Sequence, residues 1–199
     1  MTVFRRHLLI AATALPVLAV SSGSGFASQD SARAFITQLG KETVATLQPN
    51  VSAPQKAAKM EEILRRGFDF PTIGRFVLGR YWNTATPQQR EEYMKVFADF
   101  VSKSYSKRLA EEAAVSGFNI GSIRDLGEGD FLVQTSITRP SGPPLNYEWR
   151  VRTAGGNTKI VDVVVEGVSL LVTQRSDFTS VAGQNGVDGL IASLREKAR

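Results

Sequence analysis

The chain is 199 residues long, enough for one domain, and its composition excludes several kinds of chemistry. It contains no cysteine, and its single histidine, His7, lies near the N-terminus, so the rest lacks the side chains that carry most nucleophilic catalysis and transition-metal binding. The formal net charge is +5, but the lysines and arginines form no run with interleaved aromatics, which argues against a nucleic-acid partner. The composition therefore favours a binding protein over an enzyme.

The first 27 residues have the three parts of an export signal in the expected order. Arg5 and Arg6 form a positive region, residues 8–20 form an apolar stretch, and small residues precede a cleavage position before Ser28. The apolar stretch is too short for a good transmembrane helix. We therefore expect a signal peptide over residues 1–27, a periplasmic location in a Gram-negative bacterium, and a single domain over residues 28–199. Without cysteine, that domain depends on its apolar core alone.

Two helices are predicted at the start of this domain. Apolar residues between 29 and 47 fall on one helical stripe, which ends at Pro49. A capping box formed by Ser52 and Gln55 then opens a second helix.

Two further helices are predicted before the chain changes character. Residues 68–82 are typical of a third helix, made short and irregular by Gly74 and Gly79. A fourth begins at the capping box of Thr86 and Gln89 and runs to about residue 114, where Gly117 ends it.

From Phe118 onward the apolar side chains recur at every second residue, the spacing of a strand and not of a helix. Residues 131–138 and 145–152 alternate apolar and polar side chains, as antiparallel strands with one covered face do. Residues 159–166 form a third strand, whose pattern allows a continuation past a bulge at Gly167 into residues 168–172. Two short helices, at residues 176–182 and 187–197, close the chain. The order predicts an α+β fold in which the N-terminal helices pack on a C-terminal antiparallel sheet.

Three sequence blocks carry a family resemblance. One is Asp162-Val-Val-Val-Glu166-Gly-Val-Ser-Leu170, followed by Arg175 and Phe178. The others are Phe76-Val-Leu-Gly-Arg-Tyr-Trp82 with Ala85-Thr-Pro-Gln-Gln-Arg90, and Gly186-Val-Asp-Gly-Leu190. Together they span nearly the whole domain and resemble the MlaC family of periplasmic phospholipid carriers, also called toluene-tolerance or ABC-transporter auxiliary proteins.

The resemblance implies a strongly curved sheet, similar to the cone of nuclear transport factor and cystatin-like folds, that encloses an apolar cavity. Acyl chains would enter between the helices and the concave sheet face. The only bound group would be a phospholipid, with no cofactor, no metal and no catalytic residue. The partners would be an outer-membrane lipoprotein complex and the substrate-binding subunit of an inner-membrane ABC transporter, with outer-membrane lipid asymmetry as the outcome.

The candidate pocket residues are large apolar side chains on the predicted helices and strands, each of which could instead be ordinary core. They are Phe76, Tyr81, Phe97, Phe100, Val133, Tyr147, Trp149, Val163 and Val165. Arg175 has two readings: it ties the sheet to the last helices through Asp162 or Glu166, or it contacts a headgroup or a partner at the pocket mouth.

Other functions stay open at this point. A hopanoid or other lipid carrier shares the family architecture, and a lipid-independent adaptor with a collapsed cavity is a different class of protein. Ser104 and Lys107 match the S-x-x-K pattern of serine acylases, but the further motifs of that family are missing. Asp162 and Glu166 lie on one strand face, where a capping or ion-pair role is favoured over acid–base catalysis.

Overall fold

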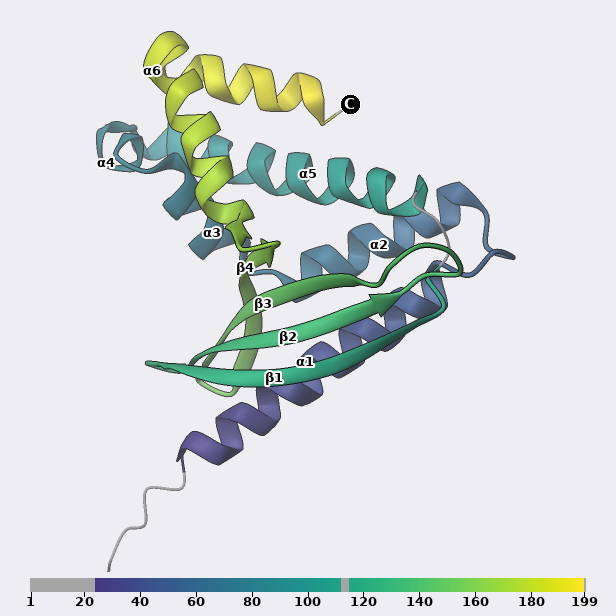
Figure 1. Ribbon diagram of the computed structural model, residues 1–199. Coiled ribbons are helices and arrows are strands. Elements are labelled where there is room, and N and C mark those ends of the chain that lie inside the picture. Colours follow the sequence, from purple (N-terminus) through teal and green to yellow (C-terminus); the bar gives the residue numbers. More distant parts are fainter. Residues whose placement is uncertain (1–23, 112–114, 199) are drawn as a thin grey trace, which may run out of the picture.

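The computed structural model describes residues 24–111 and 115–198 and confirms the α+β organisation (Figure 1). The N-terminal helices are α1 (Ser24–Thr46), α2 (Ala53–Gly67), α3 (Phe70–Leu78), α4 (Tyr81–Thr84) and α5 (Pro87–Glu111). The strands are β1 (Gly117–Gly127), β2 (Asp130–Thr138), β3 (Leu145–Ala154), β4 (Asn157–Val165) and β5 (Val168–Ser169), and α6 (Leu170–Lys197) follows. Most of the predicted signal peptide, residues 1–23, lies outside the described residues, as does the predicted end of the fourth helix at residues 112–114.

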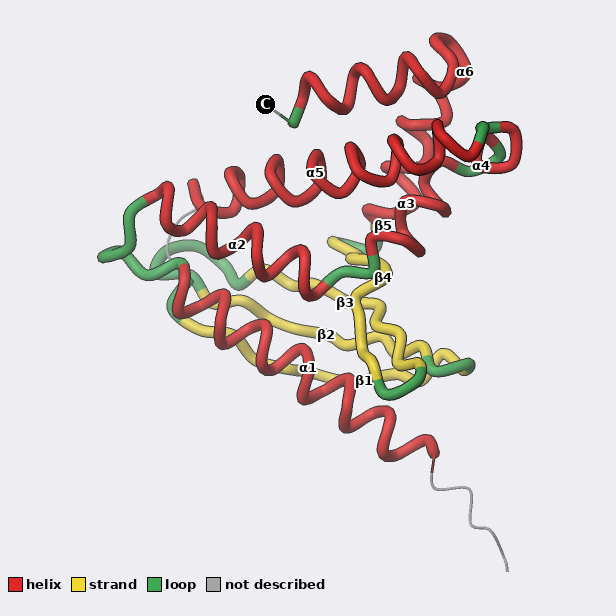
Figure 2. The backbone as a smooth tube through the Cα atoms, turned by 180° about the vertical axis from the view of Figure 1, so that it is seen from behind, coloured by secondary structure: helices red, strands yellow, loops and turns green. Residues whose placement is uncertain are grey.

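The five strands form one antiparallel sheet in the order β1-β2-β3-β4-β5, and the sheet is not closed. Figures 1 and 2 show α1 lying along one face, which we call the inner face. Phe131 pairs with Val151 and Val133 with Trp149, so these side chains share that face. The predicted alternation of β2 and β3 is therefore confirmed.

The first hydrophobic core lies between the inner face and the helices α1 and α2. On the sheet it contains Phe131, Val133, Val151 and Ile160, all at most 2% exposed. The helices contribute the apolar side chains of Ala32, Ile36, Leu39, Met60 and Ile63. This core joins the sheet to the first two helices.

The second hydrophobic core is almost entirely helical. It lies among α3, α5 and α6 and includes Phe70, Tyr93, Phe97 and Phe178. The ring centroid of Phe97 lies 5.6 Å from that of Tyr93 and 6.0 Å from that of Phe178. Within the described residues, α5 packs chiefly on α2, α3 and α6, so the domain has two apolar centres side by side.

Both predicted capping boxes are present. The backbone N–H of Thr86 donates to Oε1 of Gln89 at 3.0 Å, and the backbone N–H of Gln89 donates to Oγ1 of Thr86 at 3.2 Å. Oε1 of Gln55 likewise accepts from the backbone N–H of Ser52 at 3.3 Å. These local bonds satisfy backbone groups that the first helical turn leaves free.

The predicted helix over residues 68–82 is divided into α3 and α4. The break occurs at Gly79, whose φ of 60° and ψ of −133° lie outside the helical region. A side chain there would stand 3.1 Å from Cγ2 of Thr179 on α6. Gly74, by contrast, lies inside α3 without interrupting it.

The prediction that the third strand continues past a bulge at Gly167 is wrong. Glu166 and Gly167 have φ values of 51° and 80°, which form a tight hairpin, so the chain reverses into β5. Ser169 then caps α6 by accepting a hydrogen bond from the backbone N–H of Val172 at 3.0 Å. The final helix consequently begins at Leu170 and not near residue 176.

The two predicted closing helices are the two arms of α6, which meet at a kink at the non-helical Gly186. One other feature differs from the predictions. The pattern of residues 117–127 does not reveal β1, because the register shifts between Ile120 and Ile123 and interrupts the alternation. Gly117 is the first residue of this strand.

Candidate functional site

Part of the inner face carries large side chains that the helices cover only partly. Tyr147 and Trp149 on β3, with Val163 and Val165 on β4, are half-buried, whereas the neighbouring Val133 is fully buried. Tyr147 pairs directly with Val165 and Trp149 with Val163. We call these four residues the inner strip. It is a continuous apolar surface, because cross-strand pairs on one face are in contact.

The aromatic residues of the inner strip are held in place by local interactions. The rings of Tyr147 and Trp149 stack with centroids 5.8 Å apart. Nε1 of Trp149 donates a 2.8 Å hydrogen bond to Oγ1 of Thr135, which is 4% exposed. The polar edge of the indole is therefore satisfied within the sheet, and the rest of the ring offers apolar surface.

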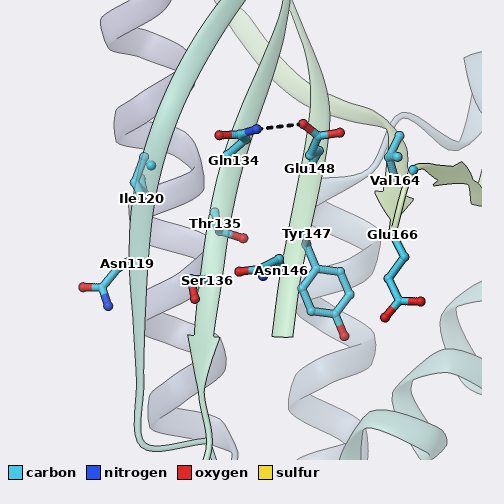
Figure 3. A pocket seen from close by; sticks show the side chains of 12 residues that line it. Asn119, Ile120, Gln134, Thr135, Ser136, Asn146, Tyr147, Glu148, Val164 and Glu166 are labelled. Carbon is cyan, nitrogen blue, oxygen red and sulfur yellow. Dashed lines mark hydrogen bonds between the residues drawn. The ribbon is translucent and has the colours of Figure 1, made fainter. Parts of the chain in front are cut away.

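A groove of about 460 Å³ lies at the Tyr147 end of the sheet, largely on the face opposite the inner face (Figure 3). Its walls come from β1, β2, β3, β4 and the turn that follows β4, and they include Tyr147 of the inner strip. Many of the side chains that line it are polar, and Nε2 of Gln134 donates to Oε1 of Glu148 at 3.0 Å. Polar and apolar surfaces therefore meet at Tyr147.

The nine predicted pocket residues are distributed over four places. Four of them form the inner strip. Val133 is fully buried in the first core, while Phe97 and the half-buried Phe100 belong to the helical core. Phe76 and Tyr81 lie at the far side of the helices, each beneath an arginine guanidinium.

Arg175 lies over the ring of Phe76, with its guanidinium carbon 4.6 Å from the ring centroid. Among the described residues it makes no ion pair, neither with Asp162 nor with Glu166. The Asp162 carboxylate instead accepts hydrogen bonds from Oγ of Ser169 at 2.6 Å and from the backbone N–H of Leu171 at 3.1 Å. Asp162 thus has the predicted capping role, at the junction of β5 and α6.

The residues considered for catalysis are not gathered into a site. Oγ of Ser104 donates to the carbonyl of Lys197 at 3.4 Å, on the helical side of the molecule. Within residues 24–111 and 115–198, no three acidic or histidine side chains are grouped so that they could hold a metal ion. None of the helices in the same ranges is both long enough and apolar enough to cross a membrane.

The pKa values of a buried tyrosine and of a buried carboxylate are shifted from their ordinary values. Burial raises the pKa of Tyr93, whose hydroxyl donates to the carbonyl of Gly74 at 3.1 Å. Burial also acts to raise the pKa of Asp130, but hydrogen bonds from Arg152 and Arg150 outweigh it and lower that pKa. Both groups belong to the scaffold and lie apart from the inner strip.

Two curated proteins are similar to this chain. The intermembrane phospholipid transport system binding protein MlaC of Haemophilus influenzae is 27% identical over 129 residues, which cover 63% of this chain and 60% of that protein. The match therefore spans less than two thirds of the length of that relative. Toluene tolerance protein ttg2D of Pseudomonas putida is 23% identical over 193 residues, covering 94% of this chain and 86% of that protein. Both names describe transport or tolerance proteins and not enzymes.

A solved structure has the same fold. The phospholipid-binding protein of Ralstonia solanacearum, determined in complex with a phospholipid, superposes with a TM-score of 0.71 at 22% identity, covering 84% of this chain and 96% of that one. The family model for MlaC protein matches residues 37–196, which run from the second half of α1 to the last turn of α6. This chain belongs to the MlaC family.

Proposed function

We propose that this protein is a periplasmic phospholipid carrier that holds acyl chains against the inner strip. The observation that carries the proposal is the half-buried apolar surface of Tyr147, Trp149, Val163 and Val165, beside fully covered neighbours on the same sheet face. Its location between sheet and helices fits the way in which family members would bind lipid. The phospholipid in the structurally similar Ralstonia protein and the names of the two relatives support the same ligand class.

The energetics of lipid transfer explain why an apolar surface is needed and a catalytic residue is not. Each methylene exposed to water costs about 0.8 kcal/mol, so a sixteen-carbon chain costs on the order of 12 kcal/mol. A carrier offsets that cost by replacing the bilayer with apolar side chains. Trp149 and Tyr147 are suited to this, because aromatic rings offer large contact areas at low conformational entropy.

The wider role extends this proposal to compartment and partners. Residues 1–27 would direct export, and residues 28–199 would form a single lipid-binding domain. The protein would exchange phospholipid between an outer-membrane lipoprotein complex and the substrate-binding subunit of an inner-membrane ABC transporter. This exchange would maintain the lipid asymmetry of the outer membrane. The name of the Haemophilus relative, an intermembrane transport system binding protein, supports this assignment.

The test is native mass spectrometry of the exported protein, purified from the periplasm without detergent, with lipid analysis of a solvent extract. We expect a one-to-one adduct of a diacyl phospholipid. A hopanoid or other polycyclic lipid would instead assign the chain to a different lipid class. A lipid-free mass that stays unchanged after incubation with phospholipid vesicles would overturn the proposal and favour a lipid-independent adaptor.

A further inference from the structure

Exposed apolar side chains are concentrated in one region of the surface. Five large apolar residues are exposed among those described, and four of them lie on α3 or at the junction of β5 and α6. They are Phe76 at 39%, Val168 at 56%, Leu170 at 36% and Val172 at 58% exposed. The fifth, Leu126, lies on β1. Water solvates such side chains poorly, so they are seldom grouped on the surface of a protein. A group of them marks an interaction surface.

Phe76 is distant from the other three residues in the sequence, but it lies close to them in space. Figures 1 and 2 show α3 beside β5 and the start of α6. Val172 precedes Arg175 by three positions on α6, so both side chains leave the same helix face. Because the guanidinium of Arg175 covers the ring of Phe76, this face of α6 is joined directly to α3.

Arginines surround the same region. Arg75 and Arg90 lie 5.8 and 5.5 Å from the ring centroid of Trp82, and Arg80 lies 5.0 Å from that of Tyr81. Together with Arg175 they make four guanidinium groups on aromatic rings. None of the four forms an ion pair with a carboxylate in the described part of the chain. Arg90 is partly buried and donates to the carbonyl of Asn83, so the charges available to an external anion are those of Arg75, Arg80 and Arg175.

A groove of about 400 Å³ lies at the centre of this surface. Arg75, Phe76, Trp82 and Arg175 line it, with Thr72 and Asn83 among the remaining walls. Cationic, aromatic and hydrogen-bonding groups thus converge on one depression, beside the exposed aliphatic residues of the β5–α6 junction.

We propose that this surface, which we call the α3–α6 patch (Arg75, Phe76, Trp82, Val168, Val172 and Arg175), docks the protein directly on an anionic lipid bilayer. Guanidinium groups bind phosphate oxygens in paired hydrogen bonds. Tryptophan is enriched at the headgroup level of membranes, and exposed aliphatic side chains gain free energy by entering the acyl boundary. An acidic protein surface would match the arginines but would leave Val168 and Val172 without apolar contacts.

The α3–α6 patch lies next to the inner strip, so docking on a bilayer would bring the proposed lipid site close to the membrane. Val168 pairs with Val165, a residue of the inner strip, across the two-residue turn after β4. If Val168 contacts a bilayer, the inner strip therefore lies only one strand away from that bilayer. The patch itself is independent of the proposed lipid site, and its vesicle binding does not require bound cargo.

The experiment is flotation of the exported, purified protein with vesicles. One set contains phosphatidylethanolamine and phosphatidylglycerol in equal parts, and the other contains phosphatidylcholine alone. We expect stronger binding to the anionic vesicles, lost as salt rises from about 0.1 M to about 1 M, because the Debye length falls from about 10 Å to about 3 Å. No preference for anionic vesicles in the unmodified protein would overturn the proposal.

Two pairs of variants test the residues. Arg75→Gln and Arg175→Gln should each lower vesicle partitioning about fivefold, and Val168→Ser with Val172→Ser should lower it about tenfold. The matched controls are Arg124→Gln and Leu126→Ser, an exposed charge and an exposed apolar residue on β1. Equal losses in patch and control variants would overturn the assignment. The assignment would also be overturned if the patch variants partitioned onto vesicles as the unmodified protein does but bound an acidic protein less well.

The same samples separate this inference from the carrier function. Native mass spectrometry of each variant measures the copurifying phospholipid, and circular dichroism checks the fold. Lost vesicle binding with retained phospholipid and an unchanged spectrum supports the α3–α6 patch. Retained vesicle binding in a protein that carries no phospholipid would support the patch and overturn the carrier proposal.

Discussion

Trp149 donates its indole hydrogen bond across the β2–β3 pair to the hydroxyl of Thr135, at 2.8 Å. The two residues are diagonal neighbours, since Trp149 faces Val133 and Thr135 faces Tyr147 in the register. The bond fixes the edge of a large ring at the boundary between the covered and the half-covered parts of the inner face. Trp149 is therefore oriented before any ligand arrives.

This arrangement predicts that Trp149→Ala lowers phospholipid occupancy severalfold while the protein stays folded. Trp149 is only half-buried, so we expect a loss of about 2 kcal/mol in the free energy of unfolding, less than for a fully buried aromatic. Native mass spectrometry and urea denaturation measure the two effects. Phe97→Leu is the matched control in the helical core, and it should lower stability without lowering occupancy. Unchanged occupancy in folded Trp149→Ala protein would remove Trp149 from the lipid site.

Gly129 is required for the β1–β2 turn. Its φ is 79°, and a side chain there would stand 2.5 Å from the backbone oxygen of Thr153, which cannot move aside cheaply. We expect Gly129→Ala to lower the free energy of unfolding by about 3 kcal/mol. Gly155→Ala is the control: its φ is 56° and nothing lies within 4 Å, so only the backbone strain of about 1 kcal/mol remains. Equal losses in urea denaturation would show that the contact with Thr153 has no energetic effect.

Asp130 makes the free energy of unfolding depend on pH. Its side chain is 4% exposed and accepts hydrogen bonds of 2.6 Å from Nη2 of Arg150 and from Nε of Arg152. Because its pKa is lowered in the folded protein, Asp130 stabilises the fold above its unfolded pKa of about 3.9. That contribution is lost as the pH falls through the folded pKa.

Asp130→Asn should therefore lower the free energy of unfolding by about 2 kcal/mol at neutral pH. The difference from the unmodified protein should shrink as the pH falls below about 4. Denaturation curves over a pH series measure this. Glu62→Gln, which breaks the exposed ion pair with Lys59, is the control and should cost less than about 0.5 kcal/mol. A constant difference across the series would contradict the assignment.

Asp162 and Ser169 should act as one unit at the start of α6. Asp162→Ala leaves the backbone N–H of Leu171 without its partner, and Ser169→Ala removes the helix cap, so each should cost about 1 kcal/mol. Since the two side chains share a 2.6 Å hydrogen bond, the double variant should lose less than the sum. Strict additivity in a double-mutant cycle would show that they act separately.

Local patterns predicted much of the fold. The helix starts at Ser52 and Thr86 follow from capping residues three positions apart, and the strands over residues 131–138 and 145–152 follow from simple alternation. These signals are short in range, since a cap or a pleat depends on neighbours within one turn or one strand pair. β1 escaped prediction because its bulge breaks the alternation. The start of α6 was not predicted because the preceding turn depends on a positive φ at Glu166, and glutamate rarely adopts a positive φ.

The sequence by itself determined that this is an α+β member of the MlaC family, and which strand faces carry the apolar side chains. Only the tertiary structure decided which element packs against each side chain. Phe97 and Trp149 are both large aromatics on apolar faces, yet three helices enclose Phe97 and Trp149 stays half-covered. The stacking of Arg175 on Phe76 likewise joins two segments a hundred residues apart. Periodicity reports the direction of a side chain, whereas burial and exposed charge depend on which distant element packs against it.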